Sequence, residues 1–276
     1  MMRSLWTAAS GMRAQQVNVD TISNNVANVN TTGYKNQQAS FKSLLYQNLQ
    51  SKSTNNAGEN KPVPAEVGLG SRVSAITSSF TQGELLANEN PFSIALEGEG
   101  FFRVQALDGT MQYTRDGSFI VSPVDGGNLL CTADGCKVLD TDGNSIILPK
   151  DGVATKVRID QNGVISYPNK KGDYEPLKNA NGNDVKLSLY QFNNPAGLTK
   201  VGNNRFAVTA ASGEAVAENG NAVLTPTKTH QYYLEGSNVD VANEMVNLIV
   251  AQRAYEMNSK AIQATDEMMQ QANNLR

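Results

Sequence analysis

Two heptad patterns, one near each end of the chain, constrain the fold of this 276-residue protein more than any other feature. In the first thirty residues, apolar side chains recur every seven residues in two series that only Gln15 interrupts. The two series are Leu5, Met12, Val19 and Val26, and Ala8, Ile22 and Val29. This period is typical of helices that pack along a narrow apolar seam, so the first helix needs a partner helix.

The last forty residues carry a matching stripe. Its members are Val241, Leu248, Tyr255, Ile262 and Met269, with Met245 and Ala251 beside them. Ser237 and Asp240 come just before the stripe and belong to the residue types that cap helix N-termini. We therefore predict a second seam helix, which packs against the first helix or against copies from neighbouring chains.

The middle of the chain shows the signals of a β protein. Asp-Gly pairs occur at 108–109, 116–117, 125–126, 134–135, 142–143 and 151–152, and Asn-Gly pairs occur at 162–163, 181–182 and 219–220. These dipeptides favour tight turns between strands, because both residue types tolerate a positive φ. Residues 50–70 are polar and contain Pro62 and Pro64, which predicts an extended linker or loop.

These patterns predict an α+β fold, with coiled-coil helices at both ends and a mainly-β domain between them. The predicted ranges are 1–35 for the N-terminal helix, 36–90 for an extended linker or hairpin, 91–225 for a β-rich outer domain and 226–276 for the C-terminal helix. We expect the two helices to pair.

Composition argues against several classes of protein. The net charge of −3 gives no basic surface for DNA or RNA. The apolar runs, such as residues 248–251, are far shorter than a membrane span. The first residues contain no convincing secretory signal peptide. We expect neither nucleic-acid binding nor membrane insertion.

The candidates for chemistry are few. A nucleophilic triad would have to use His230, the chain's single histidine. Cys131 and Cys136 are either two free thiols or a local disulfide, and they lack the further ligands of a zinc site. A pair of carboxylates of the glycosidase kind stays open as an alternative. We predict no catalytic site, no cofactor and no metal.

Three longer motifs resemble those of bacterial flagellar rod and hook proteins. They are NNVANVNTTGYK at 24–35, NPFSIALEGEGFFRV at 90–104 with YTRDGSF at 113–119, and LEGSNVDVANEMVNLIVAQRAYEMNSKAIQATDEMM at 234–269. Residues 64–91 further resemble the connection between helix and β domain in distal-rod members. Ser93 departs from the acidic residue that the family often has there, and residues 123–185 match no pattern of the family.

The resemblance implies a structural subunit of the basal body, located across the periplasm and cell wall. The terminal helices would form an inner layer around a channel, and the copies would stack helically into a hollow shaft that transmits torque. The implied partners are further copies, proximal-rod and hook proteins, ring bushing proteins where an outer membrane exists, and the flagellar type III export apparatus, which removes no signal peptide.

Two alternatives stay open: a proximal-rod or hook subunit of the same family, and a secreted carbohydrate-binding or adhesive β protein with oligomerising ends. The predicted assembly interface comprises the two seams and three asparagines. Its residues are Leu5, Met12, Val19, Ile22, Val26, Val29, Asn24, Asn25, Asn28, Val241, Met245, Leu248, Tyr255, Ile262 and Met269. The asparagine amides either bond to neighbouring subunits or lie on a solvated face before a break at Gly33.

Overall fold

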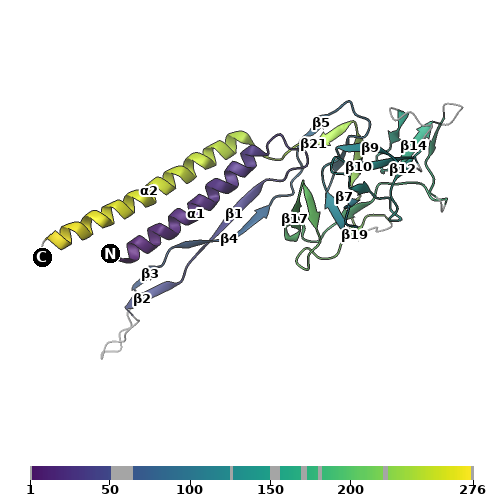
Figure 1. Ribbon diagram of the computed structural model, residues 1–276. Coiled ribbons are helices and arrows are strands. Elements are labelled where there is room, and N and C mark those ends of the chain that lie inside the picture. The colour runs from purple at the N-terminus through teal and green to yellow at the C-terminus, as the bar shows by residue number, and fades with distance from the viewer. Residues whose placement is uncertain are drawn as a thin grey trace. The chain divides into compact units, whose positions relative to one another are not determined.

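The fold was analysed in a computed structural model, which describes residues 2–50, 65–124, 127–149, 156–168, 173–179, 182–219 and 223–274. One long helix lies at each end of the chain and short strands lie between them (Figure 1), so the predicted α+β class is confirmed. Neither long helix has the length and apolar character needed to cross a membrane.

The chain forms two compact units. The first, which we call the helical unit, contains the described residues of Met1–Ala27, Gln37–Ser78 and Asp240–Arg276. The second, the β-rich unit, contains those of Asn28–Asn36 and Ser79–Val239. This division differs from the predicted ranges, because residues 28–36 and 226–239 belong with the strands and not with the helices.

In the helical unit, α1 (Met2–Ala27) packs on one side against α2 (Val241–Asn274). It packs on another side against an antiparallel pair, β1 (Gln37–Ser43) and β4 (Ser71–Ser78), as Figure 1 shows. The pair continues into β2 (Tyr46–Gln50) and β3 (Ala65–Gly68). Much of the predicted linker is therefore a long hairpin, and the proline-containing residues 51–64 lie outside the described residues.

Both helices are shorter than their predicted ranges. The chain turns after Ala27, so Asn28 and Val29 are not on the helix, and Val29 is not part of the seam. The last helix begins at Val241, where Oδ1 of Asp240 accepts a hydrogen bond from the backbone N–H of Ala242 at 2.9 Å. This confirms Asp240 as the N-cap that the sequence predicted.

The β-rich unit consists of short strands, mostly antiparallel neighbours. They are β5 (Leu85–Ala87), β6 (Ile94–Glu97), β7 (Phe101–Gln105), β8 (Met111–Thr114), β9 (Phe119–Val124), β10 (Gly127–Thr132), β11 (Lys137–Val138), β12 (Ile147–Leu148), β13 (Arg158–Ile159), β14 (Ile165–Pro168), β15 (Tyr174–Pro176), β16 (Leu189–Gln191), β17 (Thr199–Gly202), β18 (Arg205–Ala207), β19 (Val216–Ala217), β20 (Lys228–Gln231) and β21 (Tyr233–Glu235), with the 3₁₀ helix η2 (Pro195–Gly197). The largest sheet has the order β12-β10-β11-β7-β8-β18-β17. Strands β20 and β21 pair with β6 and β5, and therefore the segment before α2 belongs to this unit.

Most of the described Asp-Gly and Asn-Gly pairs form turns as predicted. Gly109, Gly135, Gly143 and Gly163 have φ between +75° and +84°, and each donates its N–H to the carbonyl three residues earlier. The pair at 116–117 differs. A Cβ on Gly117 would lie 1.7 Å from the carbonyl oxygen of Ile94. Only a residue without a side chain fits where these two chain segments approach each other so closely.

The core of the β-rich unit is complete within the unit. One cluster contains aliphatic side chains from most strands around Phe102 and Phe119, whose rings meet edge to face at 5.0 Å. A smaller aromatic cluster gathers Phe101, Tyr113 and Phe206 with their neighbours. Edge-to-face contacts of this kind add to the stabilisation from burial alone.

Candidate functional site

The predicted seam of α2 is only partly used inside the helical unit. Leu248, Ile262 and Met269 are half-buried, whereas Val241, Met245 and Tyr255 are exposed. The buried residues of α2 are instead Glu244, Ala251 and Thr265, which form a second heptad series of small and polar side chains. The sequence analysis missed this series because it contains a single apolar member.

The first helix divides its surface between two neighbours. Ala8, Ala14, Thr21, Ile22 and Asn25 are buried. The predicted seam residues Leu5, Met12, Val19 and Val26 are half-buried.

Small side chains let the two helices approach closely. A Cβ at Gly11 in the middle of α1 would lie 2.9 Å from Nδ2 of Asn258 on α2. With Ala8 and Ala251 buried as well, the helix pair is held at close range by small residues and not by interlocking large ones. The large apolar side chains therefore stay available on the outside.

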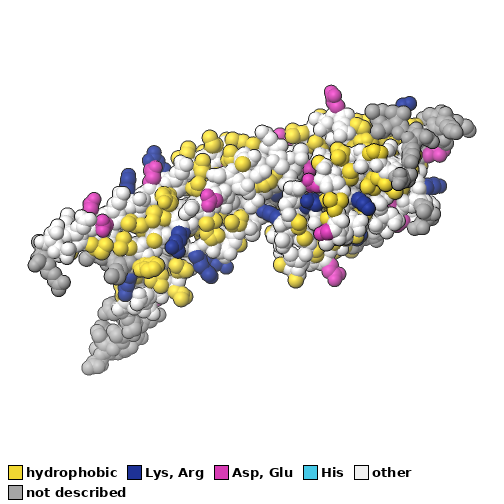
Figure 2. Space-filling view, in the orientation of Figure 1, with side chains coloured by type: hydrophobic (Ala, Val, Ile, Leu, Met, Phe, Trp, Pro, Cys, Tyr) yellow, Lys and Arg dark blue, Asp and Glu magenta, His cyan; other side chains and the backbone are white. Residues whose placement is uncertain are grey.

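Many of those side chains are exposed on α2. Val241, Met245, Val246, Ile249, Val250, Tyr255, Met257 and Met268 have between 42% and 65% of their surface exposed. Figure 2 shows apolar side chains at the surface of the helical unit. Apolar side chains in such number on one helix are typical of a surface that binds another protein.

The asparagines before the first turn have separate roles. Asn25 is 1% exposed and bonds within the unit: its Nδ2 donates to the carbonyl of Gln37 at 2.8 Å, and its Oδ1 accepts from the N–H of Gln37 at 2.9 Å. The same Nδ2 lies 3.4 Å from Oε1 of Glu244. The amide of Asn25 thus ties α1 to β1 and α2, and this corrects the predicted bonding of Asn25 to a neighbouring subunit. Asn24 is exposed and Asn28 is half-buried.

Residues 28–35, the rest of the NNVANVNTTGYK motif, belong to the β-rich unit, and Gly33 makes a close contact there. This glycine has a φ of +67°, and a Cβ on it would lie 2.8 Å from the backbone N of Asp116. Its N–H donates to the carbonyl of Glu235 at 2.8 Å. Thr32 adds a hydroxyl bond of 3.0 Å to Asp116. Only glycine combines this backbone conformation with this approach.

A buried ion triad lies at this junction. Nζ of Lys35 is 2.6 Å from Oε1 of Glu235, and Nη1 of Arg115 is 3.4 Å from Oε2 of the same carboxylate. All three side chains are almost completely buried. Further bonds support the triad: Nζ of Lys35 donates to the carbonyl of Thr81, and Nη2 of Arg115 donates to the carbonyl of Gly98. Nε of Arg115 is buried without a hydrogen-bond partner among the described residues.

Burial dominates the electrostatics of the two cations. It lowers the pKa of Lys35 below its ordinary value, and the attraction of Glu235 opposes that shift. The pKa of Arg115 is lowered by burial in the same way, with Glu235 again acting in the opposite direction. A single carboxylate therefore pairs with two buried cations, and among the described residues neither cation forms an ion pair with another acidic side chain.

The triad joins the three motifs that carried the family resemblance. Lys35 ends the first, Arg115 lies in YTRDGSF, and Glu235 begins the last. Near it, the backbone N–H of Asn36 donates to Oδ1 of Asn238 at 2.7 Å. The chain that leaves α1 is thus bound beside the chain that leads into α2. The sequence signal was the presence of charged residues in all three motifs, which the sequence analysis left unused.

The thiols and the single histidine take structural positions. Cys131 and Cys136 are buried free thiols, so the disulfide alternative is wrong. Cys131 lies opposite Lys137 in the β10–β11 hairpin. Because successive side chains of a strand point to opposite faces, the neighbouring Cys136 points to the other face and packs in the larger core cluster. His230 on β20 has its Nε2 2.7 Å from Oε2 of Glu97. Among the described residues, no three His, Cys, Asp or Glu side chains gather as metal ligands.

Comparison with known proteins decides the family. The model described as "Flagella basal body rod protein" matches residues 5–35, "Flagellar hook protein FlgE/F/G D1 domain" matches 95–167, and "Flagellar basal body rod FlgEFG protein C-terminal" matches 230–275. The second match includes residues 123–167, in which the sequence analysis found no pattern of the family, so that reading is corrected there. The chain is 42% identical to the "Flagellar basal-body rod protein FlgG" of Borreliella burgdorferi, over 100% of this chain and 99% of the relative. The chain belongs to the flagellar basal-body rod protein family.

Further relatives extend across distant bacteria. FlgG of Agrobacterium fabrum is 40% identical over 97% of both chains, and FlgG of Bacillus subtilis is 34% identical over 100% of both. The matched segments 5–35 and 230–275 contain the residues of the helix pair and two members of the triad, Lys35 and Glu235. Relatives of this kind support a structural rod subunit over the carbohydrate-binding alternative.

Proposed function

We propose that this protein is a structural subunit of the distal rod, which assembles helically with its own copies into a hollow, torque-transmitting shaft. The observation that carries the proposal is the large apolar surface left exposed on α2 beside a β-rich unit whose core is complete. Full-length relatives named flagellar basal-body rod protein FlgG support it. The proposal requires no catalytic chemistry and no cofactor.

The energetics favour assembly through many contacts. Burying one large aliphatic side chain contributes about 1.5–3 kcal/mol. Association costs on the order of 4–15 kcal/mol in lost freedom of motion. Burying a few such side chains therefore only offsets this cost. The exposed side chains of α2, added to the half-buried seam of α1, are enough when each subunit touches several copies. We therefore assign the half-buried and exposed seam residues on α1 and α2, but not the buried Ile22, to the interfaces between copies.

The remaining partners follow from the position of a distal rod. Proximal-rod subunits would meet one end of the shaft and hook subunits the other, with ring bushing proteins around it where an outer membrane exists. Delivery would be through the flagellar type III export apparatus without removal of a signal peptide. The location would be the basal body, across the periplasm and cell wall.

A matched pair of substitutions tests the proposal. Ile249→Asp places a charge on α2, where the wild-type side chain is 57% exposed, and Ile120→Asp does the same on β9, where it is 46% exposed. In a deletion strain, we expect Ile249→Asp to be made and exported without entering basal bodies, whereas Ile120→Asp restores motility. Electron microscopy of purified basal bodies reads the outcome. Equal incorporation of both variants would contradict the proposed role of α2.

Position within the basal body separates the distal rod from the related subunits. Labelled wild-type protein should lie between the proximal rod and the hook. Label at the base of the rod or along the hook would favour the proximal-rod or hook alternative.

A further inference from the structure

The chain passes between the helical unit and the β-rich unit four times, after residues 27, 36, 78 and 239. Three of these crossings lead from the β-rich unit into β1, β4 and α2 of the helical unit. On the β-rich side they end at Asn36, Ser79 and Val239. A force that the covalent chain carries from one unit to the other must pass through these crossings.

The side chain of Asn238, one residue before the last crossing, binds the segments of the other two. Its Oδ1 accepts a hydrogen bond from the N–H of Asn36 at 2.7 Å. Its Nδ2 donates to the carbonyl of Ser79 at 3.0 Å and to Oγ1 of Thr81 at 2.8 Å. The N–H of Ser79 in turn donates to the carbonyl of Asn36 at 2.8 Å. Inside the β-rich unit, the three segments are therefore each bonded to the other two.

The residue type at position 238 matches this arrangement. An amide side chain accepts at its oxygen and donates at its nitrogen, so it can join an N–H of one segment to a carbonyl of another. A carboxylate of the same shape keeps the acceptor for the N–H of Asn36 but has no proton to donate to Ser79. An alanine has neither group. Asn238 is therefore a clamp with two separable ends, one on each neighbouring segment.

The same three segments are also bonded through the buried ion triad. Lys35 on the first segment and Glu235 on the last are 2.6 Å apart at Nζ and Oε1. On the middle segment, the N–H of Gly83 donates to Oε1 of Glu235 at 3.1 Å, and the carbonyl of Thr81 accepts from Nζ of Lys35 at 2.8 Å. Networks of hydrogen bonds and ion pairs couple the segments that they join. The triad anchors the segments in the unit, and Asn238 joins them where they leave it.

We propose that Asn238 is a positioning residue that makes the three crossings share mechanical load. A force that arrives through β1, β4 or α2 then reaches all three segments together and does not pull one segment out of the β-rich unit alone. In the proposed function, torque passes through every copy of the subunit, so the clamp is loaded whenever the shaft turns. This role under load rests on the proposed function, whereas the clamp itself is a property of the single chain.

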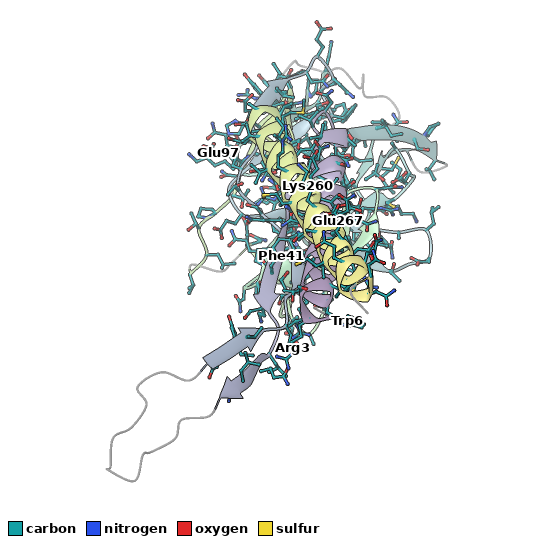
Figure 3. All side chains as sticks on the ribbon, turned by 90° about the vertical axis from the view of Figure 1, so that its left-hand side faces the viewer. Arg3, Trp6, Phe41, Glu97, Lys260 and Glu267 are labelled. Carbon is teal, nitrogen blue, oxygen red and sulfur yellow. The ribbon has the colours of Figure 1, made fainter. Side chains whose placement is uncertain are left out.

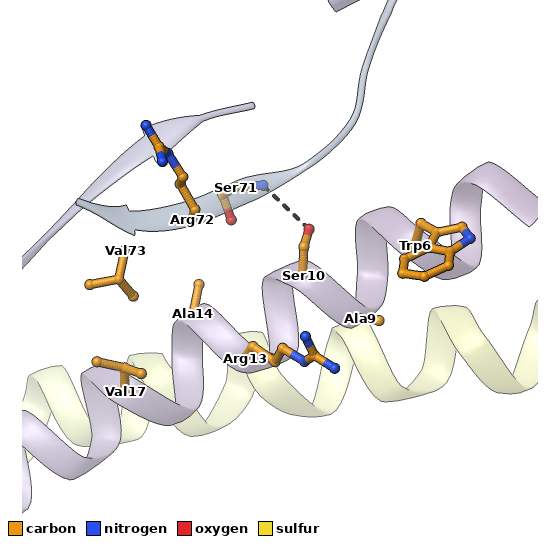
Figure 4. Close-up of a pocket in the computed structure, with 9 residues that line it drawn as sticks. All are labelled: Trp6, Ala9, Ser10, Arg13, Ala14, Val17, Ser71, Arg72 and Val73. Carbon is orange, nitrogen blue, oxygen red and sulfur yellow. Dashed lines mark hydrogen bonds between the residues drawn. The ribbon is translucent and has the colours of Figure 1, made fainter. Parts of the chain in front are cut away.

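Hydrogen exchange of the purified full chain tests the clamp. In Asn238→Ala, the N–H of Asn36 loses its Oδ1 acceptor, and its exchange rate should rise roughly three- to tenfold, as expected for one lost hydrogen bond. The N–H of Gly33, which donates to the carbonyl of Glu235, should exchange as in wild type and shows that the variant is folded. Ser10→Ala is the matched control, because it removes the hydroxyl acceptor of the Ser71 N–H in the helical unit (Figure 4) and should leave Asn36 unchanged.

Motor rotation under load tests the role of the clamp. In a deletion strain, Asn238→Ala and Asn238→Asp should give wild-type numbers of basal bodies and turn small attached beads at wild-type speed. Both should lose rotation with large beads that wild-type motors still turn, because each variant opens at least one end of the clamp. Glu97→Ala removes an exposed contact with His230 in the same unit (Figure 3) and should match wild type at every load.

The outcomes separate this inference from the proposed function. Unchanged exchange at Asn36 in Asn238→Ala, or wild-type rotation of large beads by Asn238→Asp, would overturn the clamp. Fewer basal bodies from Asn238→Asp, with equal loss of rotation at every load, would show a merely stabilising residue and would overturn it as well. If wild-type protein is absent from rods, the proposed function fails, and the exchange rates still decide whether Asn238 holds the segments together.

Discussion

The two units of this protein bury their side chains in opposite ways. The β-rich unit surrounds Phe102, Phe119 and Leu130 almost completely. The helical unit buries alanines, two threonines, an asparagine, a glutamate and a single large aliphatic residue, Ile22, and leaves large apolar side chains such as Ile249 and Met257 outside. A complete core stabilises a unit by itself, whereas an open apolar surface gains stability only from other molecules.

The two units also differ in their buried polar groups. The β-rich unit buries three charges around Glu235, which join segments about 80 to 200 residues apart in sequence. The helical unit buries the amide of Asn25 beside the single carboxylate of Glu244, and this amide joins α1 to a strand only twelve residues later and to α2. The comparison indicates that the β-rich unit contains the junction between distant segments of the chain, whereas the helical unit contains the surface that we propose to bind other copies.

The largest expected effect comes from the triad. Glu235→Ala leaves Lys35 and Arg115 buried without a counter-charge, which costs roughly 3–5 kcal/mol of folding stability. Urea denaturation of the purified chain measures the loss. Glu256→Ala breaks the exposed ion pair with Arg253 on α2 and should leave the unfolding midpoint unchanged. Similar losses from both variants would contradict the distinction between the units.

A pair of apolar truncations tests the contrast in packing. Phe102→Ala empties part of a closed core and should cost about 3–5 kcal/mol. Ile249→Ala removes an exposed side chain and should change the stability of the isolated chain by about 0.5 kcal/mol or less, while it weakens assembly. Denaturation of the monomer and counts of complete rods provide the two measurements. A large loss of monomer stability from Ile249→Ala would show that α2 is already covered.

A smaller effect is expected at Asn25. Asn25→Ala removes the partners of both backbone groups of Gln37 and should destabilise the helical unit by about 1–3 kcal/mol. The thermal midpoint of the circular dichroism signal at 222 nm should fall. Ser23→Ala, at an exposed position of the same helix, is the control and should change the midpoint little.

The smallest expected effect is a dependence on pH. Burial lowers the pKa of Lys35, so between the lowered value and the ordinary value of 10.5 the unfolded chain binds more protons than the folded chain. The stability contribution of Lys35 therefore rises as the pH rises through that interval. The stability of wild type relative to Lys35→Met should increase from pH 7 to pH 10, while the comparison with exposed Lys178→Met should stay constant.

Local patterns predicted those features that neighbours in sequence determine. The heptads predicted both helices, Asp240 predicted the start of α2, and the Asp-Gly and Asn-Gly pairs predicted turns at four described glycines. The predictions failed at the boundaries. The apolar spacing continues to Val29, but the bonds of Gly33 and Lys35 draw residues 28–36 into the β-rich unit.

By itself, the sequence determined that this chain has a helix at each end, strands between them, and motifs that resemble those of rod and hook proteins. Only the tertiary structure decided that Lys35, Arg115 and Glu235 meet, that Asn25 bonds inside its own chain, and that Ser71 on β4 bonds to Ser10 on α1. The physical reason is distance along the chain. Helices and turns arise from interactions within a few residues, whereas ion pairs and grooves depend on which distant surfaces the whole fold brings together.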